Sequence, residues 1–171
     1  MRSVLINLHS REVEDGDTAP IDSDRPARRF PKSPQVLAVL GGAAPAASPD
    51  FAPVLELIST LGQAHRRRWN AMRLLGAPGT AVEVRARTEC ELTADTELAA
   101  ALVTGIDALA RTTASDGGSV GRVLSGITWW WIVASPTDVV VRSTDESFQR
   151  LFEQCAVYNT LVDAMTQEPR G

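Results

Sequence analysis

The chain has 171 residues, of which 44% are hydrophobic and 22% are charged, and its formal net charge is −4. This length predicts one domain with an appendage, and the composition is sufficient for a hydrophobic core. The net negative charge argues against a nucleic-acid-binding protein that relies on an overall positive field, and two cysteines are too few for a disulfide framework.

Residues 1–47 differ in composition from the rest of the chain. An acidic stretch at 12–24 is followed by a basic, proline-rich stretch at 25–34, so that six acids and six bases cancel within this segment. We expect residues 1–47 to form a poorly ordered arm. Within it, residues 3–9 alternate well enough to add an edge strand, and the apolar patch at 36–40 could dock as one short turn of helix or strand. The globular domain then covers residues 48–168.

A long amphipathic helix is predicted from Ser48, which would be its N-cap, to Gly76, which would close it. Apolar residues recur along it at alternating spacings of four and three. The next segment, 82–92, alternates strictly between apolar and charged side chains, which predicts a half-buried strand. A second helix is expected to follow this strand, beginning at Thr93 or Asp95.

Two β-favouring runs, 127–133 and 139–142, flank a Ser-Pro-Thr-Asp turn and together predict a hairpin. The competing interpretation makes 119–134 a single helix, because its apolar residues also fit the helical period. Gly121 and Gly126, together with the β-favouring composition, count against that helix.

The last predicted helix begins at a capping box from Ser143 to Glu146. Seven of its residues are expected to face the core: Phe148, Leu151, Phe152, Cys155, Tyr158, Val162 and Met165. The elements together predict an α+β fold in which three main helices pack on a small, mainly antiparallel sheet. A mostly α fold is the alternative.

Three consecutive tryptophans are the most unusual feature of the predicted hairpin. On a strand, Trp129 and Trp131 point to one face and Trp130 points to the other, so both faces of the strand are apolar. One interpretation is a central core strand. The other is that one face meets a partner subunit or an apolar ligand. The candidate ligand or interface residues are then these three, with Trp69 and Arg68 of the first long helix.

His65 lies in the buried stripe of the same helix and is the candidate acid or base. Arg68 flanks that stripe, but no Ser, Cys or acid is placed by spacing to complete a catalytic set, so a core histidine with a satisfied hydrogen bond is the alternative. Arg66, Asn70 and Arg73 share one helix face that could hold a phosphate or an acidic partner. The other interpretation of these three residues is a solvated face.

Cys90 and Cys155 fall on predicted apolar faces, where thiols are usually inert. No motif for a metal or a cofactor is present, and the apolar run at 4–6 is too short for a signal peptide. We therefore expect a cytoplasmic, non-catalytic binding or regulatory module. It is expected to form a homodimer or other homo-oligomer and to engage a protein partner or a small apolar ligand, but neither nucleic acid nor a membrane. The alternative is a small enzyme acting on a hydrophobic metabolite in a Trp-lined pocket, with His65 as acid or base.

Overall fold

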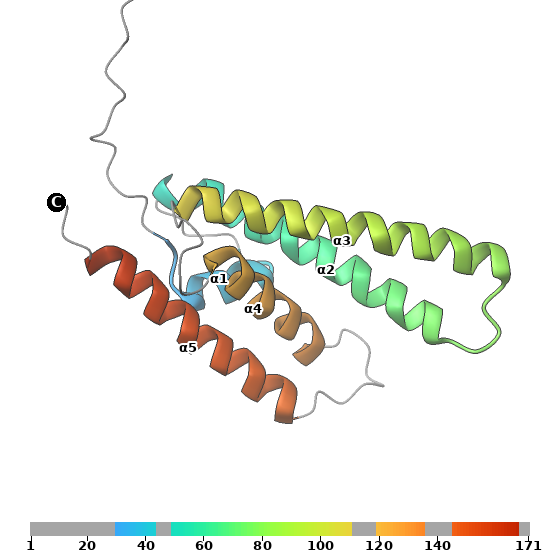
Figure 1. The fold of residues 1–171 in the computed structure, drawn as a ribbon. Helices are drawn as coiled ribbons and strands as arrows, with labels where there is room; N and C mark the ends of the chain where they lie inside the picture. Colours follow the sequence, from blue (N-terminus) through green and yellow to red (C-terminus); the bar gives the residue numbers. More distant parts are fainter. Residues whose placement is uncertain (1–29, 44–48, 111–118, 136–144, 168–171) are drawn as a thin grey trace, which may run out of the picture.

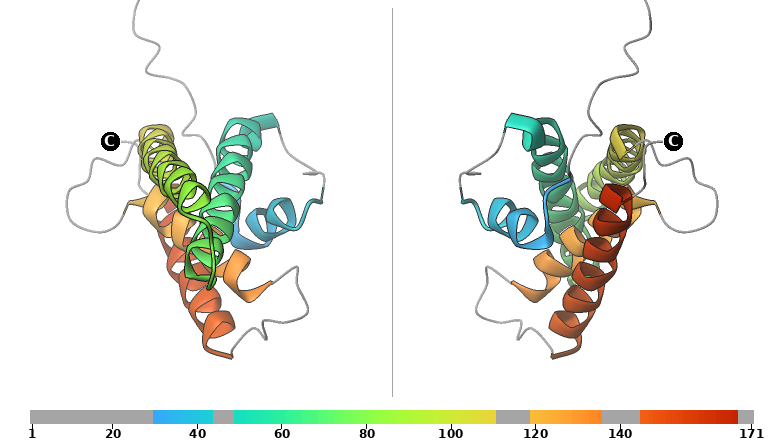
Figure 2. Two further views of the ribbon diagram at one scale, coloured as in Figure 1. Left: turned by 90° about the vertical axis from the view of Figure 1, so that its right-hand side faces the viewer. Right: turned by 90° about the vertical axis from the view of Figure 1, so that its left-hand side faces the viewer.

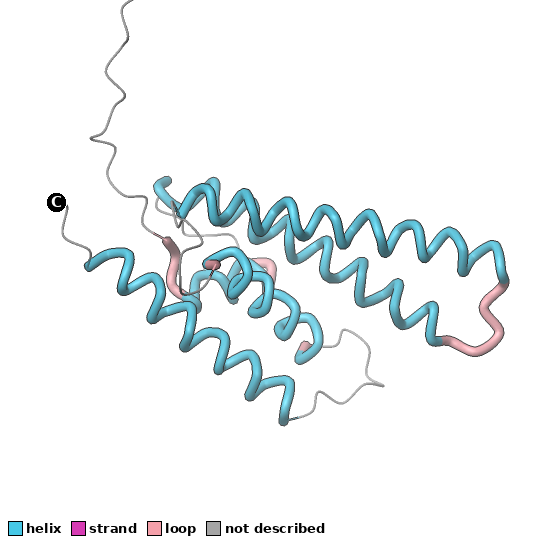
Figure 3. The backbone as a smooth tube through the Cα atoms, viewed as in Figure 1, coloured by secondary structure: helices cyan, strands magenta, loops and turns pink. Residues whose placement is uncertain are grey.

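The computed structural model describes four ranges of the chain, 30–43, 49–110, 119–135 and 145–167 (Figure 1). The elements within these ranges are all helical: α1 (Ser33–Leu40), the 3-10 turn η1 (Pro49–Phe51), α2 (Ala52–Gly76), α3 (Val82–Ala110), α4 (Val120–Ala134) and α5 (Asp145–Gln167). Figure 3 shows these helices, with a loop joining α2 to α3 and no strand in the described ranges. The predicted α+β fold is therefore wrong, and the mostly α alternative is confirmed. The edge strand expected at 3–9 lies outside the described residues.

Helix α4 lies at the centre of the fold. It packs against α2 and α3 on one side and against α5 on another, and it also contacts α1 (Figure 1). Arg122, which is exposed, is the one charged residue among the fifteen of α4, and a helix this rich in apolar residues is stable when most of its surface is covered. The prediction of a strand over 127–133 is therefore wrong: the two apolar faces belong to a helix surrounded by four others. The second predicted strand, 139–142, lies outside the described residues.

The strand predicted at 82–92 is also wrong, because this segment forms the first third of α3. Val84, Thr88 and Leu92 lie four residues apart and face the interior, where Thr88 is buried and the other two are half-buried. The outward positions hold mainly Glu, Arg and Ala, which favour helices. The alternating pattern of 82–92 fits both the two-residue period of a strand and the period of a helix. The helix that was expected to begin at Thr93 or Asp95 is the continuation of α3.

Helices α2 and α3 form an antiparallel hairpin whose far half continues past the end of α4 (Figure 1). The helix predicted to end at Gly76 is confirmed as α2, which begins at Ala52 after η1. Ser48, its expected N-cap, lies outside the described residues. The connection to α3 turns at Gly79, whose φ of +81° is a left-handed conformation that suits glycine. Figure 2 shows the pairing of the two helices from both ends.

Residues 30–43, which belong to the segment predicted to be a poorly ordered arm, pack on the helical domain. The Tyr158 hydroxyl of α5 donates a hydrogen bond of 2.8 Å to the carbonyl of Pro31. The Asn159 side chain accepts from the backbone N–H of Ser33 at 3.0 Å and donates to the hydroxyl of Ser33 at 2.9 Å. These bonds join the beginning of α1 to α5 across more than 120 residues of sequence.

Helix α5 contacts α4 and α1 but neither α2 nor α3. Of the seven residues expected in the core, four are buried and Met165 packs against them. The burial predicted for the other two is wrong, because Phe148 is 39% exposed and Phe152 is 65% exposed. The burial predicted for Cys90 is wrong as well, since Cys90 lies on the exposed side of α3, whereas Cys155 is buried.

Candidate functional site

Several of the candidate residues meet around Trp129, where α4 crosses α2. The ring of Trp129 lies nearly perpendicular to the rings of His65 and Trp69, with centroid distances of 5.7 Å and 5.9 Å. The guanidinium carbon of Arg68 lies 5.6 Å from the centroid of the Trp129 ring, which is a cation–π contact. Ser125, one turn before Trp129 on α4, completes the group. We call these five residues the Trp129 cluster.

Both ring nitrogens of His65 have hydrogen-bond partners. Nε2 lies 2.8 Å from Oγ of Ser125, and Nδ1 lies 3.0 Å from Nη1 of Arg68. A guanidinium group can only donate, so Nδ1 is the acceptor and the ring proton is on Nε2. His65 therefore donates to the hydroxyl of Ser125.

The environment of His65 opposes its protonation. Burial of the side chain, and then the positive charge of Arg68, lower the pKa of His65 from 6.5 to about 4. His65 is thus neutral at pH 7 and offers its proton, not a lone pair, to Ser125. In a serine hydrolase the opposite holds: a carboxylate accepts from Nδ1–H, and Nε2 is the base. The geometry therefore favours a core histidine with satisfied hydrogen bonds over a catalytic base.

Trp130 and Trp131, which follow Trp129 on α4, point away from the Trp129 cluster. Consecutive residues on a helix are turned by about 100° from one another, so the three rings leave α4 in different directions. Trp130 and Trp131 are half-buried and pack against the hydrophobic core. Trp131 lies beside α1, where a Cβ added to Gly41 would be 3.6 Å from its ring. The expectation that Trp129 and Trp131 share one face is wrong because it rested on a strand.

Arg66, Asn70 and Arg73 are exposed along α2, as a shared surface face requires. Between them in sequence, Arg67 turns instead toward α3, where its Nε and Nη2 bind the carboxylate of Asp95 at 2.6–3.0 Å. These hydrogen bonds raise the pKa of Arg67. The sequence could not reveal this pair, because its two members lie on different helices.

A hollow of about 430 Å³ lies beside this ion pair, between the far halves of α2 and α3. Its lining includes Asn70, Leu74, Thr88 and Glu91, and it includes neither His65 nor a tryptophan. The Trp-lined pocket that the enzyme hypothesis requires is therefore not this hollow.

Within the described ranges, no group of three or more His, Cys, Asp or Glu residues could hold a metal ion. None of the helices described is long and apolar enough to cross a membrane. Comparison of the chain with protein-family models, with curated proteins and with solved structures found no match.

Proposed function

We propose that this protein is a non-catalytic binding module that self-associates through the outer face of α5. The observation that carries the proposal is the exposure of Phe148 (39%) and Phe152 (65%) on adjacent turns of this helix. Residues four apart on a helix are neighbours, so the two rings form one apolar patch. Aromatic side chains are enriched in the centres of protein interfaces.

The order of residues along α5 favours a second copy of the chain as the partner that covers this apolar patch. Phe148, Phe152 and Ala156 lie at four-residue intervals, and all three are exposed. When two α5 helices pair antiparallel about a two-fold axis at Phe152, each Phe148 lies opposite the small Ala156 of the copy. A two-fold interface requires such a self-complementary patch. The three residues of the patch carry no charge, and at its border Arg150 and Glu153 form an ion pair at 3.3 Å.

The enzyme hypothesis receives less support from the site. His65 is buried, neutral and hydrogen-bonded through both nitrogens, so no lone pair remains for proton transfer. We also propose a cytoplasmic location, because the two cysteines are free and a reducing compartment suits an exposed thiol such as that of Cys90.

Size-exclusion chromatography with light scattering tests the self-association. The expected result is a dimer of the full chain at micromolar concentration and a monomer for Phe152→Glu, because the new charge would be buried between the two helices. Val82→Glu is the matched control: Val82 is 77% exposed at the start of α3, outside the proposed interface, and this variant should remain dimeric. A monomeric wild type, or a dimeric Phe152→Glu variant, would contradict the proposal.

A further inference from the structure

Arg68 is a cation with no negative charge beside it in the described structure. It lies on α2 between His65, one turn earlier, and Trp129 of α4. Both of these neighbours are uncharged. No ion pair joins Arg68 to any carboxylate in the ranges that the structure describes, and its Nε is buried without a hydrogen-bond partner. A charge that is partly removed from water in this way favours a partner of opposite sign.

The acid of α3 that faces this part of α2 is already bound. Asp95 of α3 receives hydrogen bonds from two nitrogens of Arg67, the residue next to Arg68, and its side chain is only 13% exposed. A carboxylate held by two nitrogens of one guanidinium is a strong pair that has little reason to rearrange. The guanidinium of Arg68 therefore remains available to a group that this part of the chain does not supply.

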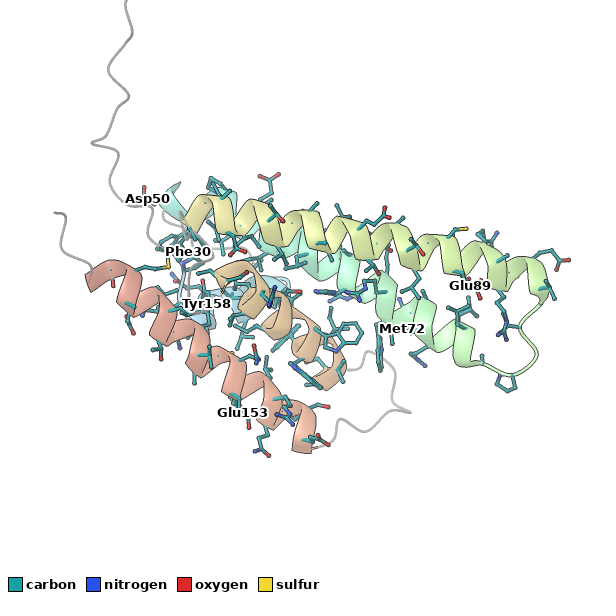
Figure 4. All side chains as sticks on the ribbon, in the orientation of Figure 1. Phe30, Asp50, Met72, Glu89, Glu153 and Tyr158 are labelled. Atoms are coloured by element: carbon teal, nitrogen blue, oxygen red, sulfur yellow. The ribbon has the colours of Figure 1, made fainter. Side chains whose placement is uncertain are left out.

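The surface next to Arg68 is apolar and reaches the solvent. Trp69 packs edge-on to Trp129, and Met72, one turn beyond Arg68 on the same side of α2, is 45% exposed. Figure 4 places Met72 on the part of α2 that continues past the end of α4. Arg66 lies one turn before Trp69 and is exposed, so this apolar surface has a cation at its border.

We propose that Arg68, Trp69, Met72 and Trp129 form a binding surface for an acidic segment of a protein partner. A carboxylate of the partner accepts hydrogen bonds from the guanidinium of Arg68, and a neighbouring apolar side chain packs on Trp69 and Met72. Charge-assisted bonds to a guanidinium and contact with tryptophan together give both orientation and affinity. This inference rests on the proposed binding function but not on self-association, because the acidic segment binds α2 and α4 whereas the dimer face lies on α5.

Two synthetic peptides of about 15 residues, long enough for a few helical turns, are the probes. One contains Ala, Leu and Glu, and its partner has Gln in place of every Glu. Neither contains tryptophan, so the fluorescence of the protein reports binding and isothermal titration gives the affinity. The Glu peptide should bind and shift the tryptophan emission, the Gln peptide should bind at least about tenfold more weakly, and added salt should weaken the Glu peptide's binding.

Variants of the surface separate recognition from folding. Arg68→Gln can still donate to His65 but lacks the charge, so its affinity for the Glu peptide should fall to that of wild type for the Gln peptide. Arg68→Lys should stay within a few-fold of wild type. Met72→Glu, at an exposed position that tolerates the change, should weaken binding by repulsion. Arg87→Gln, which removes an exposed cation on α3, should change nothing.

The inference is overturned if the two peptides bind equally well or if neither binds. It is also overturned if Arg68→Gln and Met72→Glu both keep full affinity. Hexanoate, a small apolar acid, is a further probe: if it shifts the emission while the Glu peptide does not, the site binds a small apolar acid and the inference is overturned. Repeating the titration on Phe152→Glu keeps the two proposals apart. Loss of the dimer with intact peptide binding supports both, and a monomeric wild type that still binds the peptide overturns only the self-association.

Discussion

Gly121 lies where α4 crosses the backbone of α3, and Gly121→Ala should loosen that crossing. A Cβ on Gly121 would be 2.3 Å from the carbonyl oxygen of Val103, about 1.1 Å closer than the 3.4 Å at which ordinary contact begins. The obstacle is backbone, so no side-chain rotation can relieve it, and the two helices must separate. Their separation also strains the 2.8 Å hydrogen bond from the Gly121 N–H to the Asp107 carboxylate of α3.

The expected cost follows from these contacts. Overpacking costs about 1–3 kcal/mol, and weakening the hydrogen bond from the first turn of α4 to Asp107 adds about 1 kcal/mol. Alanine has a higher helix propensity than glycine, which adds up to about 1 kcal/mol to the free energy of unfolding. The net loss of about 1–3 kcal/mol in the free energy of unfolding corresponds to a Tm lower by about 2–12 °C. Thermal unfolding followed by circular dichroism measures this change.

Gly126→Ala is the matched control on the same helix. A Cβ there would lie 2.8 Å from Oε1 of Gln154, which is the end of a flexible side chain that can rotate away. The gain in helix propensity then offsets the adjustment, and the variant should unfold within about 1 kcal/mol of wild type. If Gly121→Ala unfolds at the temperature of wild type, or if both variants lose the same stability, the close crossing of α3 and α4 is wrong.

Three further predictions concern the polar groups inside the fold. The folded-state pKa of His65 (about 4) lies below the unfolded value of 6.5, so the neutral side chain contributes its full stabilisation above pH 6.5. Urea unfolding should show that this contribution is lost as the pH falls from 6.5 to 4, at up to about 1.4 kcal/mol per pH unit. His65→Gln should lack this pH dependence. Asp107→Asn removes the charge that accepts from the Gly121 N–H at the start of α4, so urea unfolding should show a loss of about 1–2 kcal/mol, and no loss would contradict the cap. Tyr158→Phe leaves the buried carbonyl of Pro31 without its donor, so the Tm should fall by an amount equivalent to about 1–2 kcal/mol, and an unchanged Tm would mean that residues 30–43 contribute little to stability.

The sequence predicts the long, one-sided helices and fails on the central one. Helices α2 and α5 each have a polar face against an apolar stripe, and such stripes reveal the helical period. The apolar residues of α4 fit the helical period, but 127–133 is also a continuous run whose Trp, Ile and Val residues favour strands. In α3, the apolar residues of 82–92 fit both periods, and only packing against α2 selects Val84, Thr88 and Leu92 as the inner set.

The candidate site is predictable in part, for the same reason. The spacing of His65 and Trp69 along α2 places them on the inner stripe, and the structure brings Trp129 against both. Ser125 lies four residues before Trp129, and the single helix considered as the alternative over 119–134 would have put the two on one side. The pairing of Arg67 with Asp95 depends on how α2 and α3 align across space, which no local pattern encodes.

The exposure of the phenylalanines on α5 could not be read from spacing either. Phe148 and Phe152 border the buried stripe, and they would be covered if α5 were enclosed on two sides. Among the described helices, α5 packs on α4 and α1 and on no other, which leaves this border open to solvent. From that exposed border we infer that two chains pair through their α5 helices.

Disulfide cross-linking at the proposed two-fold axis tests that claim most directly. In a Cys90→Ser background, Phe152→Cys places a thiol of each copy at the axis, and mild oxidation should convert most of the protein into a covalent dimer on a non-reducing gel. Val157→Cys, at a position that is also exposed (48%) but on another side of α5, should remain monomeric under the same conditions. Equal cross-linking of the two variants, or none by Phe152→Cys, would contradict the proposed pairing of α5 helices.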